Sequence, residues 1–148
     1  MSLASLVPPF KAGGICHSTS AALQFAVCGL EVEHIIVLGH ARCGEVKALL
    51  ETPQEAFTDE NFITSWMSIA ETTRKQVLAR TDLPTFEALA HACELGTKEA
   101  SLTNLQTFPW ISEAMKHGKL QLHGWYYDLE AGNLLRFDSA KKTFRPLS

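Results

Sequence analysis

The chain has 148 residues with 13 Lys and Arg against 16 Asp and Glu, so its formal net charge is −3 (13 − 16). Hydrophobic residues make up 46% and charged residues 20%, a composition typical of globular proteins rather than disordered or fibrous ones. This charge lacks the cationic excess of nucleic-acid and anionic-membrane binders, and no apolar run approaches the roughly 20 residues that span a bilayer. We therefore expect a soluble, cytoplasmic protein that binds neither nucleic acid nor membrane.

Two helices and a buried strand are predicted in the first third of the chain. Apolar residues at helical spacing predict a helix over residues 19–29. The run His34–Leu38 is apolar and β-branched without polar alternation, which predicts a strand covered on both faces, as in a parallel sheet. A second helix is expected from Glu45 until Pro53 ends it.

The middle of the chain is predicted to be helical. Apolar spacing predicts a long helix over residues 59–80, with Asp59 as a plausible cap. Another helix is expected to begin near Pro84 and to continue through Leu105, because proline is favoured in a first helical turn. A short helix follows over Trp110–His117.

The last portion of the chain changes period. Residues 119–127 alternate and then carry aromatic side chains that favour a strand, and Leu134–Phe137 is the expected hairpin partner. The remaining basic residues are expected to form a solvated tail: Lys141, Lys142 and Arg145. The order of helix, strand, several helices and hairpin indicates a single α/β domain over residues 1–148.

A histidine and a cysteine follow the predicted buried strand in the segment Gly39-His40-Ala41-Arg42-Cys43-Gly44. Ligands bind at the carboxyl ends of strands in open α/β sheets, and a turn there can aim the His40 imidazole and the Cys43 thiolate at one point. Both groups are good zinc ligands, at about 2.0–2.3 Å. The alternative interpretation, a loop histidine beside a buried thiol, stays open because this spacing is common by chance.

The other cysteines and aromatic residues favour structural roles. Cys28 and Cys93 are expected to be packed as small apolar residues. His123 lies in a predicted strand, where a hydrogen-bonded core or interface imidazole is more common than a ligand. Tyr126 and Tyr127 alternate faces, so one can line a pocket or interface while the other packs.

Residues 18–50, from Ser-Thr-Ser-Ala-Ala-Leu through His-Ile-Ile-Val-Leu-Gly-His-Ala-Arg-Cys-Gly, closely resemble the β-class carbonic anhydrases. Later blocks agree in the same order: Glu94, Ser101–Leu105, Phe108-Pro109 and His123–Asp128. The resemblance extends from about Ser5 to Phe137. It implies an α/β fold with a sheet flanked by helices, and a zinc-dependent lyase that interconverts carbon dioxide and bicarbonate.

The family holds zinc with two cysteines and one histidine, and the resemblance assigns His40 and Cys43 to the histidine and the second cysteine. The first cysteine belongs to an upstream Cys-x-Asp-x-Arg motif that this sequence does not contain. Cys16 precedes the matched block without that aspartate and arginine, so no catalytic role carries over to it. The resemblance therefore implies an incomplete zinc site, whose third ligand could come from Cys16, a symmetry mate or solvent, and a sheet whose N-terminal strands are missing.

We expect a carbonic anhydrase whose activity in this chain is impaired by loss of the first zinc ligand. The alternative is a non-catalytic scaffold or interaction fragment that retains the packing of the family. In either case the strand over Ile35–Leu38 loses a neighbour, and its unpaired amides and carbonyls favour pairing with another chain. We therefore expect a homodimer or a higher homo-oligomer.

Overall fold

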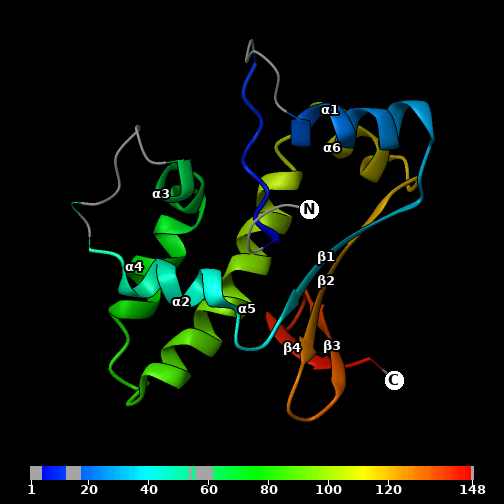
Figure 1. Ribbon diagram of the computed structural model, residues 1–148. Helices are drawn as coiled ribbons and strands as arrows, with labels where there is room; N and C mark the ends of the chain where they lie inside the picture. The colour runs from blue at the N-terminus through cyan, green and yellow to red at the C-terminus, as the bar shows by residue number, and fades with distance from the viewer. Residues whose placement is uncertain (1–4, 13–17, 54, 56–61, 148) are drawn as a thin grey trace.

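A long helix, α5 (Phe86–Leu105), lies between a four-stranded sheet and a group of shorter helices (Figure 1). This computed structural model describes residues 5–12, 18–53, 55 and 62–147. The other helices are α1 (Ser18–Gln24), the π-helix η2 (Phe25–Gly29), α2 (Gly44–Glu51), α3 (Phe62–Met67), the 3-10 helix η4 (Ser68–Ala70), α4 (Glu71–Leu78) and α6 (Pro109–Lys116). The strands are β1 (His34–His40), β2 (Gln121–Asp128), β3 (Asn133–Asp138) and β4 (Thr143–Pro146).

The sheet has the strand order β1-β2-β3-β4, so β1 is an edge strand among the described residues. β1 runs parallel to β2, whereas β2, β3 and β4 form antiparallel pairs. This arrangement confirms the α/β class and the open edge expected from the sequence. The expectation that β1 is covered on both faces is wrong, because Ile36 and Leu38 are 45% and 50% exposed. Val37 and Gly39 alternate with them and are buried on the other face.

Helix α5 joins the two halves of the molecule. The Thr85 hydroxyl accepts a hydrogen bond from the Ala88 amide at 3.1 Å and caps the first turn of the helix. α5 contacts β1 and β2 with one side and α2 and α4 with another. Cys93, near the middle of the helix, is fully buried as predicted.

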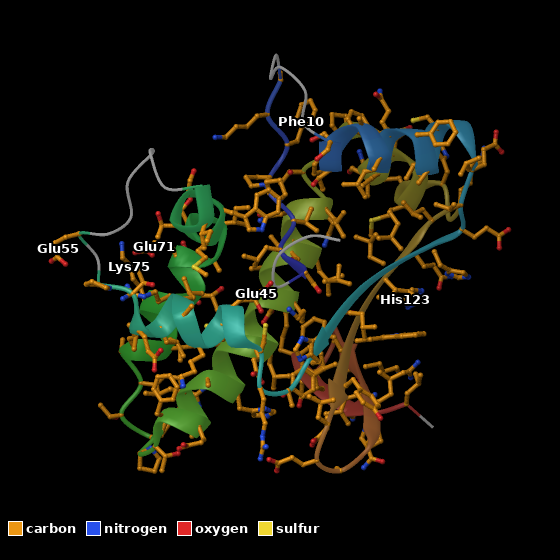
Figure 2. The ribbon with its side chains drawn as sticks, viewed as in Figure 1. Phe10, Glu45, Glu55, Glu71, Lys75 and His123 are labelled. Atoms are coloured by element: carbon orange, nitrogen blue, oxygen red, sulfur yellow. The ribbon has the colours of Figure 1, made fainter. Side chains whose placement is uncertain are left out.

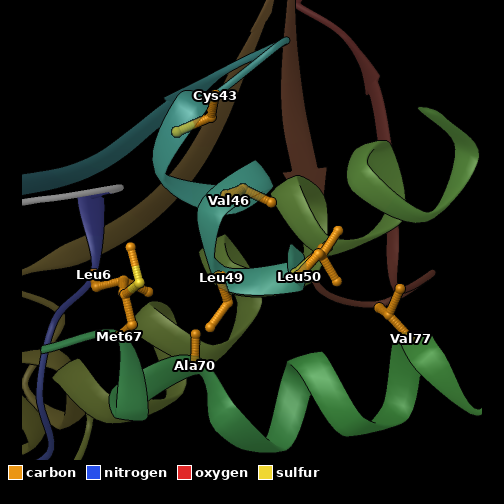
Figure 3. Packing of buried hydrophobic residues seen from close by; sticks show 9 residues of the cluster. Leu6, Cys43, Val46, Leu49, Leu50, Met67, Ala70 and Val77 are labelled. Carbon is orange, nitrogen blue, oxygen red and sulfur yellow. The ribbon is translucent and has the colours of Figure 1, made fainter. Parts of the chain in front are cut away.

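Two clusters of buried apolar side chains form the core. The first gathers where α2, η4, α4 and α5 meet, and Figure 3 shows its members from close by: Leu6, Cys43, Val46, Leu49, Leu50, Met67, Ala70, Val77 and Cys93. The second lies between the sheet, η2, α5 and α6: Val27, Val37, Leu102, Leu105, Phe108, Ile111 and Leu120. Because Cys43 belongs to the first cluster, the candidate site is built directly on the core.

The segment from Leu6 to Phe10 has no regular structure, yet it lies along α5 and the turn after it. The Val7 amide donates to the Ser101 hydroxyl at 3.1 Å, and the Asn104 side-chain amide donates to the Val7 carbonyl at 2.8 Å. The Phe10 amide donates to the Thr107 hydroxyl at 2.8 Å. Two side chains of α5 and one of the turn after it therefore supply hydrogen-bond partners that a neighbouring strand would otherwise give.

Two helix predictions are refined by the structure, and the packing predicted for Cys28 is wrong. The helix predicted over residues 19–29 exists, but its second half is the π-helix η2. Cys28 is exposed rather than packed, because Val27 is the η2 residue that turns toward the core. The predicted helix 59–80 is divided into α3, η4 and α4, and the proposed cap Asp59 lies outside the described residues.

The predicted basic tail is exposed to solvent, as expected, but part of it is the edge strand β4, to which Arg145 belongs. Phe144 packs against Phe137 with ring centroids 5.2 Å apart, which gives this short strand an apolar anchor. Arg145 pairs with Asp138, and the Lys142 Nζ lies 3.1 Å from a Glu99 carboxylate oxygen. The basic composition of this segment therefore gave no indication of the strand, or of the acidic partners that Lys142 and Arg145 have.

None of the helices in the described part of the chain is both long enough and apolar enough to cross a lipid bilayer.

Candidate metal and catalytic site

The turn that carries the candidate ligands connects the end of β1 to the start of α2. The Ala41 amide donates to the Tyr127 carbonyl at 2.9 Å, which continues the β1–β2 pairing one residue beyond the strand. Arg42 adopts a left-handed conformation with φ of 56° and its guanidinium pairs with Glu130. The chain therefore reverses sharply between His40 and Cys43, at the carboxyl end of a parallel strand as the sequence predicted.

His40 is exposed at the end of β1. Its Nδ1 lies 2.8 Å from the Ala41 carbonyl oxygen. A carbonyl only accepts hydrogen bonds, so Nδ1 carries a proton, and in the neutral ring the lone pair is on Nε2. Metal-binding histidines commonly have this arrangement, in which one ring nitrogen is held by the backbone and the other is available to a cation.

Cys43 caps α2 and is 6% exposed. Its Sγ lies 3.5 Å from a Glu45 carboxylate oxygen, to which the thiol donates. Burial raises the pKa of Cys43, against the opposing effect of hydrogen bonds from the backbone amides of Val46 and Glu45. A metal ion at this sulfur would have to displace a proton, so its binding would be coupled to pH.

A buried carboxylate holds the Cys43 end of the turn. Glu94, on α5, is 3% exposed, and one of its oxygens accepts the Cys43 backbone amide at 2.8 Å. The other oxygen accepts the Tyr126 hydroxyl at 2.6 Å. The same hydroxyl lies 3.1 Å from Nδ1 of His91, so the contacts run from the Cys43 amide through two buried side chains to a partly exposed imidazole.

Tyr126 confirms the predicted alternation of the two tyrosines, since it is fully buried while Tyr127 is 40% exposed. Burial and the neighbouring Glu94 carboxylate raise the pKa of the Tyr126 phenol. The phenol therefore stays a hydrogen-bond donor to Glu94 over the physiological pH range. The contact between Glu94 and Tyr126 was not predicted, because it joins α5 to β2 across 32 residues.

A pocket of about 430 Å³ opens beside the turn. Its lining includes Cys43, Glu94 and Tyr126, together with the apolar surfaces of Phe86 and Ala90. This volume suits a small ligand. His40 does not line the pocket, although it belongs to the described part of the chain, so the two predicted ligands face different environments.

A buried lysine lies behind the turn. Lys98 of α5 is 2% exposed and passes so close to Gly39 that a Cβ at that glycine would lie 1.9 Å from the lysine Cε. Burial lowers the pKa of Lys98, and the nearby Cys43 and Glu94 oppose this effect. The absence of a side chain at Gly39 therefore leaves room for the Lys98 side chain beside the candidate site. The sequence analysis did not identify Lys98, because the apolar spacing of α5 gives no sign that a lysine belongs to the buried side of the helix.

No three His, Cys, Asp or Glu side chains among the described residues are grouped so that they could hold a metal ion. His40 and Cys43 have the donor chemistry that zinc needs, but they supply two donors where catalytic zinc sites use three protein ligands. Cys16, which the sequence raised as a third donor, lies outside the described residues.

Comparison with known proteins decides the family. The model of the family described as carbonic anhydrase matches residues 2–134. The chain belongs to this family. Among its curated relatives, it is 36% identical over 126 residues to the chloroplastic beta carbonic anhydrase 5 of Arabidopsis thaliana, covering 85% of the chain. It is 34% identical to carbonic anhydrase 1 of Escherichia coli O157:H7, covering 97% of the chain.

The fold agrees with that of a solved member of the family. The β-carbonic anhydrase CcaA superposes with a TM-score of 0.86 at 31% identity, over 99% of this chain and 64% of CcaA. The chain spans 41% of the length of the Arabidopsis relative and 64% of that of the Escherichia coli relative. The resemblance read from the sequence is thus confirmed for a carbonic anhydrase chain that corresponds to part of these relatives.

Proposed function

We propose that this chain is the His40–Cys43 portion of a β-class carbonic anhydrase, which reversibly hydrates carbon dioxide to bicarbonate. The observation that carries the proposal is the turn after β1, where a backbone-held imidazole and a carboxylate-anchored cysteine lie three residues apart. His40 through Nε2 and Cys43 through Sγ are the proposed zinc ligands. When bound there, zinc supplies Lewis acidity that brings the pKa of a bound water toward neutrality.

The protein groups around the turn suit that reaction. Glu94 fixes the backbone at Cys43, so the sulfur is positioned by the core rather than by a free loop. The apolar surfaces of Phe86 and Ala90 in the adjacent pocket favour an uncharged, poorly hydrated substrate such as carbon dioxide. Arg42, paired with Glu130 at the rim, provides a positive charge near the path of a departing bicarbonate.

We infer that the 148-residue chain on its own has little or no hydration activity. The inference rests on its two proposed ligands, because zinc with two protein ligands is held less firmly than at the usual three. A non-catalytic scaffold or interaction fragment is the alternative function, and the same ligand count favours it. A Cys-x-Asp-x-Arg motif encoded upstream of Met1 would identify the chain as part of an enzyme, and its absence there would favour the scaffold.

Self-association also belongs to the proposal. Among the described residues no strand pairs with the outer edge of β1, and Ile36 and Leu38 are large apolar side chains exposed on one face of that strand. Such an edge favours a second copy of the chain, so we propose a homodimer or a higher homo-oligomer. A stable monomer in sedimentation experiments at micromolar concentration would contradict this. The cytoplasmic location stays a prediction.

Zinc analysis combined with a carbon dioxide hydration assay tests the proposed site. Cys43→Ser should lower the zinc content of the purified chain, whereas Cys28→Ser, a matched change at an exposed cysteine, should leave it unchanged. Equal zinc content in Cys43→Ser and the original chain would refute the ligand role of Cys43. Turnover at the rate of ordinary zinc hydratases would refute the proposed impairment.

A further inference from the structure

Two histidines meet on the exposed face of the sheet, at the opposite end of β1 from the candidate site. His34 is the first residue of β1, and His123 is the third residue of β2. Figure 2 labels His123. In the parallel register His34 lies opposite Gln121, and His123 is two residues further along the same face. The two rings are therefore diagonal neighbours, with centroids 5.2 Å apart.

The nitrogen atoms of these rings are close enough to share one cation. Nδ1 of His34 and Nε2 of His123 are hydrogen-bonded at 3.1 Å, which confirms the hydrogen-bonded imidazole predicted at His123. One of these two nitrogens therefore carries a proton that a metal ion would have to displace. Two imidazole nitrogens bound to one Zn²⁺ at about 2.05 Å are about 2.9 Å apart at a right angle and about 3.3 Å apart at a tetrahedral angle. The observed separation falls between these values, so the strands already hold both nitrogens at the spacing of neighbouring ligands.

We propose that His34 and His123 form a second binding site for a divalent transition-metal ion such as Zn²⁺, separate from the His40–Cys43 turn. His34 is exposed and His123 is half-buried, so solvent water can complete the coordination shell. Imidazole nitrogen is a preferred ligand for zinc, copper and nickel. His40 is six residue steps along extended β1 from His34, which corresponds to about 20 Å.

The surroundings indicate a site of modest affinity. Arg136 on β3 is close enough to influence His123 electrostatically, and its positive charge disfavours a dication. The described residues add no third His, Cys, Asp or Glu to this pair. With two protein ligands and an opposing charge, we expect binding in the micromolar range, weaker than at a closed structural zinc site.

Zinc titration followed by NMR of the histidine rings at pH 7.5 tests the proposal on the full 148-residue chain. The ring signals of His34 and His123 should shift together with one dissociation constant and one equivalent of Zn²⁺. His34→Asn should weaken the zinc response of His123 about a hundredfold, because a chelating pair becomes a single ligand. His117→Asn, at an exposed histidine of α6, should leave the response unchanged.

Three outcomes overturn the proposal: no shift of either ring at millimolar Zn²⁺, shifts with unrelated affinities, or an unchanged His123 response in His34→Asn. Because His34 is exposed, its replacement should not impair folding, which circular dichroism will check. The ring of His40 is followed in the same spectra, so failure at this pair is distinguished from failure of the proposed catalytic ligand.

Discussion

The Glu94 carboxylate accepts the backbone amide of Cys43 at 2.8 Å, although the two residues are 51 positions apart in the chain. This bond ties the start of α2 to the middle of α5. The second carboxylate oxygen is used by Tyr126, so one buried side chain connects the turn, the central helix and the sheet. The position of the Cys43 sulfur therefore depends on packing at a distance from the turn itself.

Replacing Glu94 with glutamine should destabilise the protein by about 1–3 kcal/mol. The amide oxygen of glutamine can accept only one of the two hydrogen bonds. If it keeps the Cys43 amide, its NH₂ group meets the Tyr126 hydroxyl, which must then accept instead of donate and turn its own hydrogen toward His91. Urea unfolding measures the loss. Glu99→Gln, which removes an exposed ion pair with Lys142, is the control and should cost less than about 1 kcal/mol. Equal losses in both variants would show that the buried carboxylate has no special role.

Gly39→Ala should destabilise the protein by about 1–3 kcal/mol through overpacking. The new methyl group would lie 1.9 Å from the Lys98 Cε, so either the lysine or β1 must move. Adding Lys98→Ala should recover part of the loss, and a double-mutant cycle measures that coupling. Gly44→Ala is the matched control, since nothing lies within 4 Å of its added Cβ. Additive effects of Gly39→Ala and Lys98→Ala would contradict the contact.

The cysteines should differ sharply in alkylation. Cys28 is exposed, whereas Cys93 is fully buried and burial raises its pKa to about 11. Relative to an ordinary thiol, the shift alone lowers the thiolate fraction of Cys93 about a hundredfold. Mass spectrometry after brief iodoacetamide treatment should find Cys28 modified and Cys93 intact until denaturant is added. Modification of both at similar rates in the native protein would be inconsistent with this packing.

Asp138 should stabilise the β3–β4 hairpin in full above about pH 4 and lose this effect at lower pH. The Lys141 backbone amide is the main cause that holds the pKa of Asp138 below its usual value, with Arg145 adding to it. A carboxyl with a lower pKa in the folded state adds stability above its unfolded value of about 3.9 and loses it as the pH falls through the folded value.

Asp138→Asn should therefore lower the melting temperature at pH 7, and the difference from the original chain should shrink at pH 3. Thermal unfolding at pH 7, 5 and 3 measures this. Glu51→Gln, at an exposed carboxyl 3.9 Å from the Lys47 Nζ, should show a small effect at each pH. A constant difference for Asp138→Asn between pH 7 and pH 3 would argue against an ionised partner.

The sequence predicted β1, α2 and the turn between them because each leaves a local signal. An apolar run ending at Gly39 and a helical pattern starting at Glu45 bracket the two candidate ligands without tertiary information. The exposure of Ile36 and Leu38 was missed because an apolar run indicates burial on both faces, whereas the described residues cover only the face of β1 that carries Val37 and Gly39.

Other features depended on contacts that no local pattern reveals. β4 was not predicted, because the basic residues in and before it suggested a solvated tail. The contact that holds this strand against β3 is between the rings of Phe144 and Phe137. The role of Glu94 follows from α5 bringing it against Cys43. The His34–His123 pair depends on the parallel register of strands almost ninety residues apart, and the sequence predicted only a hydrogen-bonded imidazole at His123.

The irregular segment from Leu6 to Phe10 holds α5 and the core together. Its backbone is hydrogen-bonded to the side chains of Ser101, Asn104 and Thr107. The Leu6 side chain packs in the core and is 1% exposed. A protease cut between Leu6 and Phe10 would strip hydrogen-bond partners from one side of the central helix and open a void beside Met67. Limited digestion at that point should therefore loosen the helical half of the protein, even though no helix or strand has been severed.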